Sequence, residues 1–454
     1  MADPSHFSDP FWTPPQDGLH TLPQSNKASY GVPPSWSSLD RTVGVELKIG
    51  GLGTISAKAE LPEKSLMFIV HSENPNTQPT LKLEVTKDNC ILKKRETDSD
   101  QYKPIPELVD LNPQVKDRAK YTDKVMFPKG KKSALLDATS SDKTTYWISV
   151  DRSNARIRYG KYLTNNSMTF MEVLFDPKKA EWMKNLNSTD VYRDNDPVPS
   201  KNIRFNEAPV TTDFPPLVVP QDQITLKQIE EFSAMTFANL PEGCQKLYHN
   251  ISGPGITVQS NEFPQLPEAI DLSCRDENKV CGKILKGKEK EFGGKDETYL
   301  RITVGDNLAN SPGIPYVMEI WPPGHYSPIH QHGDASAIIR VLYGSIDVTW
   351  FDALEKKRTP KPINNPVRLS KGDMTWLGEN QYQIHQLKNN TDKVCITLQC
   401  YQFEKNDTIH DEAFHWIDKD LEIKDFIPES DNAYGTFVRE MKEEWEKENS
   451  KLPN

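Results

Sequence analysis

Short runs of alternating apolar and polar residues recur along the chain from about residue 41. The run from Val43 to Ile49 places an apolar residue at every second position. Successive side chains of a β-strand point to opposite faces, so this alternation predicts a strand with one buried face. Turn-forming residues separate several such runs, and little helical periodicity interrupts them. The pattern predicts an antiparallel β-sandwich over residues 41–186. Its other expected strands span residues 66–70, 81–85, 145–150, 155–160 and 169–175.

A second series of short apolar runs follows between about residues 298 and 405. Glycines at positions 344, 372 and 378 separate some of the runs, as glycines do where a strand must turn. The chain is therefore expected to be mainly β, with two separate β units. The strands expected in the second unit span residues 299–304, 316–321, 337–342, 346–351, 374–377, 382–387 and 394–403.

The segment between the two units is rich in proline. Residues 187–222 are interpreted as an extended linker. Thr225 then caps an expected helix, and Gln228 stands three residues later, where it completes a capping box. The face of this helix that is expected to be buried comprises Leu226, Ile229, Phe232 and Met235.

Three further segments complete the predicted organisation. Residues 1–40 are rich in Pro, Ser, Asp and Asn and are interpreted as a disordered arm. The charged run over residues 280–297 is interpreted as a solvated surface loop. A helix beginning at Thr436 is expected to pack against the second β unit. Its apolar face comprises Phe437, Val438, Met441 and Trp445.

Composition and charge exclude several classes of function. The 454 residues carry 55 Lys and Arg against 65 Asp and Glu, a formal net charge of −10, which argues against a nucleic-acid-binding protein driven by bulk charge. No apolar run approaches the roughly 20 residues of a membrane helix. The first residues lack the pattern of a secretory signal. The six cysteines include no C-x-x-C pair. We therefore expect a cytoplasmic protein without a membrane or nucleic-acid partner; the oligomeric state stays open.

Histidines provide the first candidate chemistry. His330 and His332 stand two positions apart, so on a strand both imidazoles project to the same face and can meet one metal ion. The obvious third ligand is His385. An isolated pair of this spacing is also common among ordinary surface or core histidines, and the surrounding residues must decide between these readings.

The surrounding glycines strengthen the metal interpretation. Gly324 and Gly344 frame the pair as G-x5-H-x-H-x11-G, and a later segment has Gly372, His385 and Asn389. These two segments resemble the two motifs of the cupin superfamily, and the resemblance implies a metal inside a jelly-roll barrel. Most metal cupins supply a Glu five residues after the second His, where this chain has Ala337. Three neutral imidazoles leave the metal charge uncompensated, which favours an anionic, soft ligand such as a thiolate.

Over about residues 298–405 the chain resembles the cysteine dioxygenase family. The shared residues begin at Trp321 and run through Gly324, His325, Ser327 and Ile329 to His330 and His332. The resemblance implies ferrous iron, Fe2+, on His330, His332 and His385. It implies that Arg301 binds the substrate carboxylate, and that Tyr401 and Tyr299 hydrogen-bond to the substrate or to oxygen. Two positions depart from the family: Ala337 stands where animal members have a Cys crosslinked to the Tyr, and Gln399 replaces a His.

The resulting functional hypothesis is an iron-dependent thiol dioxygenase. It would add both atoms of O2 to the sulfur of a small thiol, with L-cysteine giving cysteine sulfinic acid. One alternative is another metal-dependent cupin enzyme, such as a lyase or an isomerase. A second is a non-catalytic cupin that binds a ligand. The first sandwich is expected to be an accessory or binding domain, and residues 223–454 to form the cupin domain with its flanking helices.

Overall fold

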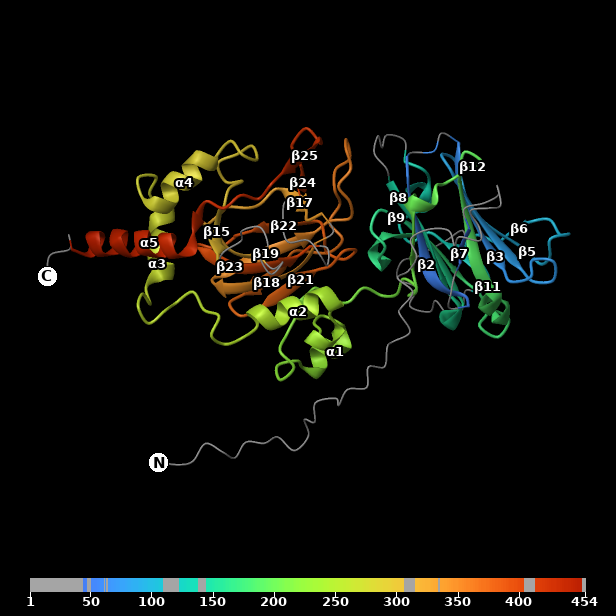
Figure 1. Ribbon diagram of the computed structural model, residues 1–454, viewed down its shortest axis with the longest axis horizontal. Coiled ribbons are helices and arrows are strands. Elements are labelled where there is room, and N and C mark those ends of the chain that lie inside the picture. Colours follow the sequence, from blue (N-terminus) through green and yellow to red (C-terminus); the bar gives the residue numbers. More distant parts are fainter. Residues whose placement is uncertain are drawn as a thin grey trace, which may run out of the picture.

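The computed structural model describes residues 44–46, 50–60, 62, 64–108, 122–137, 144–305, 315–333, 335–403 and 413–450. The disordered arm expected over residues 1–40 lies outside these residues. Two β bodies lie side by side along the longest axis of the molecule, the first blue to green and the second mainly orange and red (Figure 1). Each body contains two sheets.

The first body is an antiparallel sandwich. Its strands are β1 (Gly44–Glu46), β2 (Leu52–Ala59), β3 (Ser65–Ser72), β4 (Thr80–Thr86), β5 (Cys90–Arg95), β6 (Lys103–Pro104), β7 (Lys124–Met126), β8 (Thr144–Asp151), β9 (Arg156–Lys161), β10 (Thr169–Leu174), β11 (Leu186–Arg193), β12 (Asp196–Pro197) and β13 (Ile203–Asn206). One sheet has the order β1-β11-β3-β4-β5-β6, with β12 beside β11, and the other has the order β13-β2-β8-β9-β10-β7.

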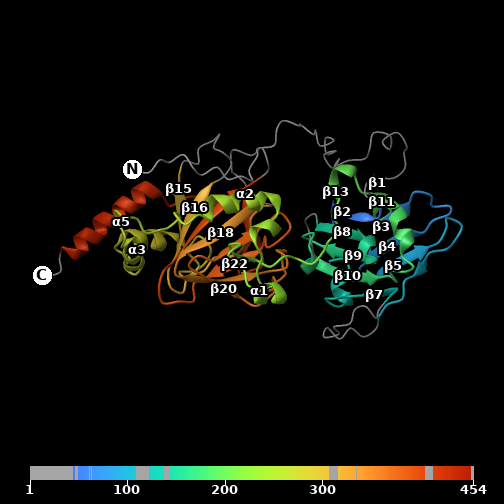
Figure 2. The ribbon, with the colours of Figure 1, turned by 90° about the horizontal axis from the view of Figure 1, so that it is seen from below.

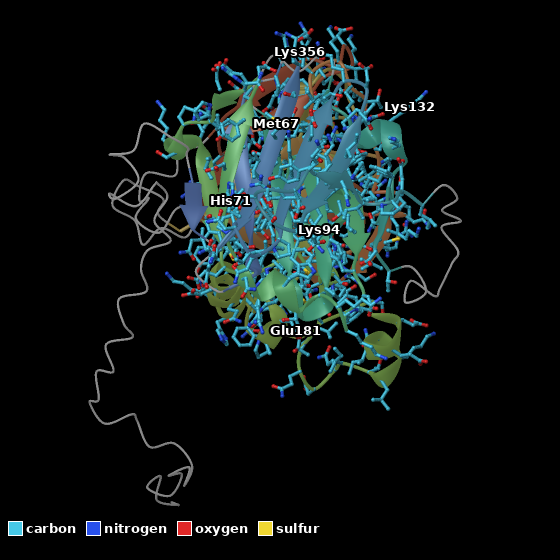
Figure 3. The ribbon with its side chains drawn as sticks, turned by 90° about the vertical axis from the view of Figure 1, so that its right-hand side faces the viewer. Met67, His71, Lys94, Lys132, Glu181 and Lys356 are labelled. Carbon is cyan, nitrogen blue, oxygen red and sulfur yellow. The ribbon has the colours of Figure 1, made fainter. Side chains whose placement is uncertain are left out.

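Alternation along the strands builds the core of this sandwich. On β3, Leu66 and Phe68 are fully buried, whereas Met67 and His71 are partly exposed. Figure 3 shows Met67 and His71, together with Lys94 of β5, on the outward face of their sheet. The inward residues pack against the opposite sheet in one apolar cluster that includes the fully buried Trp147. The apolar residues that alternate along these strands in the sequence are therefore the residues whose side chains are buried.

The predicted linker over residues 187–222 is wrong in its first half. Strands β11, β12 and β13 lie within or across it and belong to the first sandwich, and Val210 is buried in the same core. The strand β11 was missed because its central residues Thr189 and Asp190 are polar and yet buried, so no apolar alternation marks it. Pro197 lies in the two-residue strand β12, which pairs only with β11, an edge position at which proline is tolerated.

The second body is a jelly-roll barrel. Its strands are β14 (Leu217–Val218), β15 (Leu300–Val304), β16 (Tyr316–Trp321), β17 (Ile329–Gln331), β18 (Ser336–Tyr343), β19 (Ser345–Trp350), β20 (Val367–Ser370), β21 (Met374–Leu377), β22 (His385–Lys388), β23 (Cys395–Gln402), β24 (Phe414–Ile417), β25 (Ile423–Phe426) and β26 (Asn432–Ala433). One sheet has the order β14-β21-β18-β23-β16-β15-β26 and the other has the order β20-β19-β22-β17-β24-β25.

Helices pack on the outer side of the first of these two sheets, where Figure 2 shows α2 beside β18, whereas α5 begins near β15 and runs away from the barrel. The helices are α1 (Leu226–Glu231), α2 (Glu242–Ile251), α3 (Leu266–Cys274), α4 (Val280–Lys288) and α5 (Tyr434–Asn449). On β23, Cys400 faces the helices and Cys395 faces the barrel interior. The alternate positions of β15, β16 and β23 therefore send their side chains into the barrel.

Two expectations about helices are wrong. The capping box at Thr225 is present, but the exposed fractions are 86% for Leu226 and 56% for Ile229. The helix ends at Phe232, which has a φ of 50°, so the predicted buried face never forms. The charged run over residues 280–297 contains the helix α4, in which Cys281 and Leu285 are buried. These two residues are four apart and share one face, among lysines that obscure the apolar stripe.

Other expectations are confirmed. The C-terminal helix α5 buries Phe437 and Met441 against the barrel. The fold class is mainly β, with a jelly-roll barrel after an antiparallel sandwich. Gly344 turns the chain between β18 and β19 at a φ of 71°, and a Cβ there would lie 2.5 Å from the Val394 carbonyl oxygen, so the motif glycine is required. Across the described part of the chain, no helix combines the length and apolarity needed to cross a membrane.

Candidate metal centre

Three imidazoles from two neighbouring strands converge inside the barrel. His330 on β17 stands opposite His385 on β22 in the antiparallel register, and His332 follows directly after β17. The candidate ligand atoms of the three residues lie within 4.8 Å of one another. The structure therefore brings together the three residues that the sequence predicts as metal ligands.

Backbone carbonyls fix the orientation of two of these rings. The Nδ1 atom of His330 lies 3.0 Å from the Pro328 carbonyl oxygen, and Nδ1 of His332 lies 3.0 Å from the Gln383 carbonyl oxygen. Because a carbonyl can only accept, each Nδ1 must carry the hydrogen and donate it. The proton-free nitrogen of each ring is then Nε2, the atom left to bind a metal.

Burial keeps the three rings neutral. It lowers the pKa of His330 to about 4, with a further contribution from the charge of Arg301. Burial also lowers the pKa values of His332 and His385 well below the usual range of histidine. A divalent metal needs neutral imidazoles, so the donor set fits a transition metal ion such as Fe2+.

Within the described residues, the group that could hold a metal contains no carboxylate. Ala337, at the position where most metal cupins have Glu, is fully buried. It stands opposite Tyr401 in the antiparallel pairing of β18 and β23. A small apolar side chain therefore lies beside the phenol, and a crosslink between these two positions is chemically impossible.

Aromatic side chains surround the three histidines. The His332 ring lies 4.8 Å from Phe414 and 6.0 Å from Tyr401, centroid to centroid, and His330 lies 6.1 Å from Phe426. Tyr299 stacks on Trp321 at 4.3 Å. These rings make the interior apolar around the imidazoles, which strengthens electrostatic interactions there.

Arg301 lies in this interior, but it already has a carboxylate partner. Its guanidinium NH1 donates to Oε1 of Glu319 at 2.6 Å, and the exposed fractions of the two side chains are 7% and 4%. The other Glu319 oxygen accepts from the Gln399 amide, whose oxygen in turn accepts from the hydroxyl of Tyr401. Arg301 and Tyr401, which the sequence predicts as substrate-binding residues, are thus joined through Glu319 and Gln399 in one buried polar network.

The ionisation of this network follows from burial and charge. Burial raises the pKa of Glu319 to about 7, against the opposing effects of Arg301, Lys288 and Gln399. Burial alone would lower the pKa of Arg301, but Glu319 and the phenols of Tyr299 and Tyr401 outweigh it, so its pKa lies above its usual value. Arg301 is therefore a permanent cation in a site with little water.

Sequence reasoning missed Glu319, although a signal was available. It is the one acidic residue of the apolar strand β16, and it stands two positions before Trp321, so both side chains face the barrel interior. Other motif residues are structural. His325 Nδ1 donates to the Thr298 carbonyl oxygen at 2.9 Å, and the Asn389 amide donates to the Trp321 carbonyl oxygen at 2.7 Å.

Comparisons with known proteins find similarity to solved structures over part of the chain. No protein-family model matches the chain, and no curated protein matches it. Similar solved structures include the cupin domain of Cnp3 from Schizosaccharomyces pombe (12% identity, 23% of this chain, 65% of that chain, TM-score 0.19). Another is the DMSP lyase DddQ from Ruegeria pomeroyi DSS-3 (18% identity, 24% of this chain, 49% of that chain, TM-score 0.18). A third is a recombinant oxalate oxidase in complex with glycolate (15% identity, 23% of this chain, 51% of that chain, TM-score 0.19).

The matched part of the chain spans about half to two-thirds of the length of these three proteins. The jelly-roll fold itself stands on the order and pairing of the strands. The resemblance to cysteine dioxygenases stands on the sequence motifs.

Proposed function

We propose that the barrel is an iron-dependent thiol dioxygenase that acts on a small thiol. The observation that carries this proposal is the group of three buried, neutral imidazoles without a carboxylate among the described residues. Such a set leaves the double charge of a metal ion uncompensated. A thiolate substrate supplies the missing negative charge and a soft donor atom.

The proposed reaction balances without a further reactant. One thiol and one O2 give one sulfinic acid: the S–H bond is lost, both oxygen atoms become bonded to sulfur, and the proton remains on the product or passes to water. Sulfur loses four electrons and O2 gains four. L-Cysteine giving cysteine sulfinic acid is the pair that the family resemblance implies.

His330, His332 and His385 would hold the metal. Bound there, Fe2+ would supply the redox chemistry that lets dioxygen react with a thiolate. The residues of the chain would bind and orient the substrate: Arg301 is a donor in the barrel interior, and the Tyr401 hydroxyl lies at the end of the network through Gln399. The rings around the histidines exclude water from the reacting groups.

An oxygen-electrode assay tests the proposal. Protein reconstituted anaerobically with Fe2+ should consume O2 when a small thiol is added and should form the matching sulfinate, with one O2 consumed per product. Retention of zinc or manganese, with no thiol-dependent oxygen uptake over a panel of thiols, would instead favour another metal-dependent cupin enzyme. Ligand binding without turnover would favour a binding protein.

The variant His332→Ala provides a sharper test of the centre. Loss of one of three ligands should lower the affinity for metal at least about 100-fold and abolish oxygen uptake, as measured by metal content and the electrode. His415→Ala is the matched control, since His415 lies on the same sheet but its Nε2 contacts Oδ1 of Asp425 at 3.2 Å near the surface. Equal metal content in both variants would contradict the assigned ligands.

A further inference from the structure

Glu319 changes the role that the sequence alone assigns to Arg301. The two groups lie 2.6 Å apart and are almost fully buried. When Glu319 is ionised, above its raised pKa of about 7, they form a pair with no net charge. The second oxygen of Glu319 is held by Gln399, which keeps the carboxylate in place. An incoming substrate carboxylate would meet a cation that is already neutralised.

The guanidinium nevertheless keeps a free donor. The Nε–H of Arg301 is buried and has no hydrogen-bond partner among the described residues. Glu319 and Gln399 connect the guanidinium to the hydroxyl of Tyr401, and the ring of Tyr401 lies 6.0 Å from that of His332, so Arg301 belongs to the surroundings of the candidate metal centre. A buried unpaired donor costs about 1–3 kcal/mol, and a bound ligand that offers an acceptor to Nε–H recovers this energy.

The charge balance decides what kind of acceptor is favoured. A second carboxylate would lose its hydration and lie close to the negative charge of Glu319, whose charge Arg301 already balances. An amide or ester carbonyl accepts the same hydrogen bond without a charge, and its desolvation costs far less. The Arg301–Glu319 pair therefore makes binding of a neutral hydrogen-bond acceptor more favourable than binding of an anionic one.

We propose that the Arg301–Glu319 pair makes this centre selective for thiols that carry a neutral hydrogen-bond acceptor, such as a carboxamide, in place of the carboxylate of cysteine. The inference rests on the proposed function and narrows its substrate class. Glu319 is the specificity-determining residue, and it acts through the charge of Arg301. L-Cysteinamide and L-cysteine are the natural probes, because they differ at this one group.

The test measures binding and turnover separately, at pH 8, where a carboxyl group with a pKa of about 7 is mainly ionised. Full-length protein is loaded anaerobically with Co2+, and the thiolate absorption band gives Kd for each probe. Oxygen uptake by the Fe2+ protein gives kcat/KM for the same probes. The wild type should favour L-cysteinamide at least tenfold in both measurements.

Glu319→Gln should lower the preference for L-cysteinamide at least tenfold, because Arg301 then becomes an unbalanced cation that attracts carboxylate. Glu319→Asp keeps the charge and should keep the preference. Glu172→Gln is the matched control: Glu172 pairs with Arg158 at 2.9 Å, equally buried, in the first sandwich, and its loss should leave the preference unchanged. Because the wild type alone already compares two ligands, the test does not depend on the folding of a variant.

The outcomes separate the two proposals. Tighter binding of L-cysteine than of L-cysteinamide by the wild type, or an unchanged ratio in Glu319→Gln, would overturn the selectivity proposal while oxidation of either thiol supports the dioxygenase. Selective binding of L-cysteinamide without oxidation of any thiol would uphold the selectivity and overturn the dioxygenase. Failure to bind either thiol would overturn the selectivity.

Discussion

At the scale of single residues, the three histidines of the candidate metal centre were predictable from the sequence, and the pair of Arg301 with Glu319 was not. Residues two apart on any strand share a face, so His330 and His332 could be assigned to one centre from their spacing, and motif resemblance supplied His385. The contact between Arg301 and Glu319 depends on the register of β15 against β16, in which these residues stand opposite each other. Registers between strands cannot be read from alternation alone.

Glu319 also makes a prediction about stability and pH. Its carboxyl group faces Arg301, Lys288 and Gln399, with the phenols of Tyr299 and Tyr401 nearby. Burial raises its pKa from 4.5 to about 7. Between these pH values the folded protein keeps a proton that the unfolded chain releases, so ionisation disfavours the folded state as pH rises.

The free energy of unfolding of the metal-free wild type, relative to Glu319→Gln, should therefore fall as pH rises from about 4.5 to 7 and then level off. A shift of about 2.5 pH units corresponds to about 3 kcal/mol at most. Urea unfolding of both proteins across this range measures the difference. A difference that moves in favour of the wild type with rising pH would show that Arg301 outweighs burial.

At the scale of elements, the strands were more predictable than the helices. Most predicted strands exist because alternation is visible wherever one face is buried. The helix α4 was missed because lysines surround its two buried positions, and α1 was misassigned because a capping box reports where a helix begins and not which face is covered. Which face of a helix is covered depends on its tertiary contacts, and these contacts depend on the fold of the whole barrel.

The difference in burial between α4 and α1 can be measured by shortening one side chain in each helix to alanine. Leu285→Ala in α4 removes a buried side chain that packs against the barrel and should lower the free energy of unfolding by about 2–4 kcal/mol. Ile229→Ala in α1 removes a side chain that is 56% exposed and should change it by about 0.5 kcal/mol or less. Chemical denaturation gives both values. Equal effects would mean that α4 does not pack as described.

At the scale of the whole molecule, a short strap joins the two bodies. The strap comprises residues 214–216. Their backbone carbonyl oxygens accept hydrogen bonds from the side chains of Tyr382, Trp376 and Thr375 of the barrel. Between the bodies lies a cleft of about 480 Å³, lined by residues of both, including Arg204 and Glu379, which also form an ion pair at 3.4 Å. The prolines in the sequence indicated a linker here, but not that it would be bonded to the barrel.

We propose on this basis that the barrel with its strap is an independent metal-binding domain. All described residues around the three histidines belong to the second body, so a fragment of residues 209–454 should bind Co2+ within about threefold of the full chain. A fragment of residues 224–454 lacks the strap and β14 and should unfold at a lower temperature. Calorimetry measures both, and loss of metal binding by the longer fragment would contradict the proposed independence.

The pairing of His330 with His385 has a consequence for how the protein matures. These two imidazoles are 55 positions apart in the chain and meet only when β17 has joined β22. A local peptide segment supplies at most His330 and His332, so the complete set of three ligands forms only after β17 has paired with β22. In a refolding sample, the cobalt spectrum of the three-ligand site should therefore not develop before these two strands have paired.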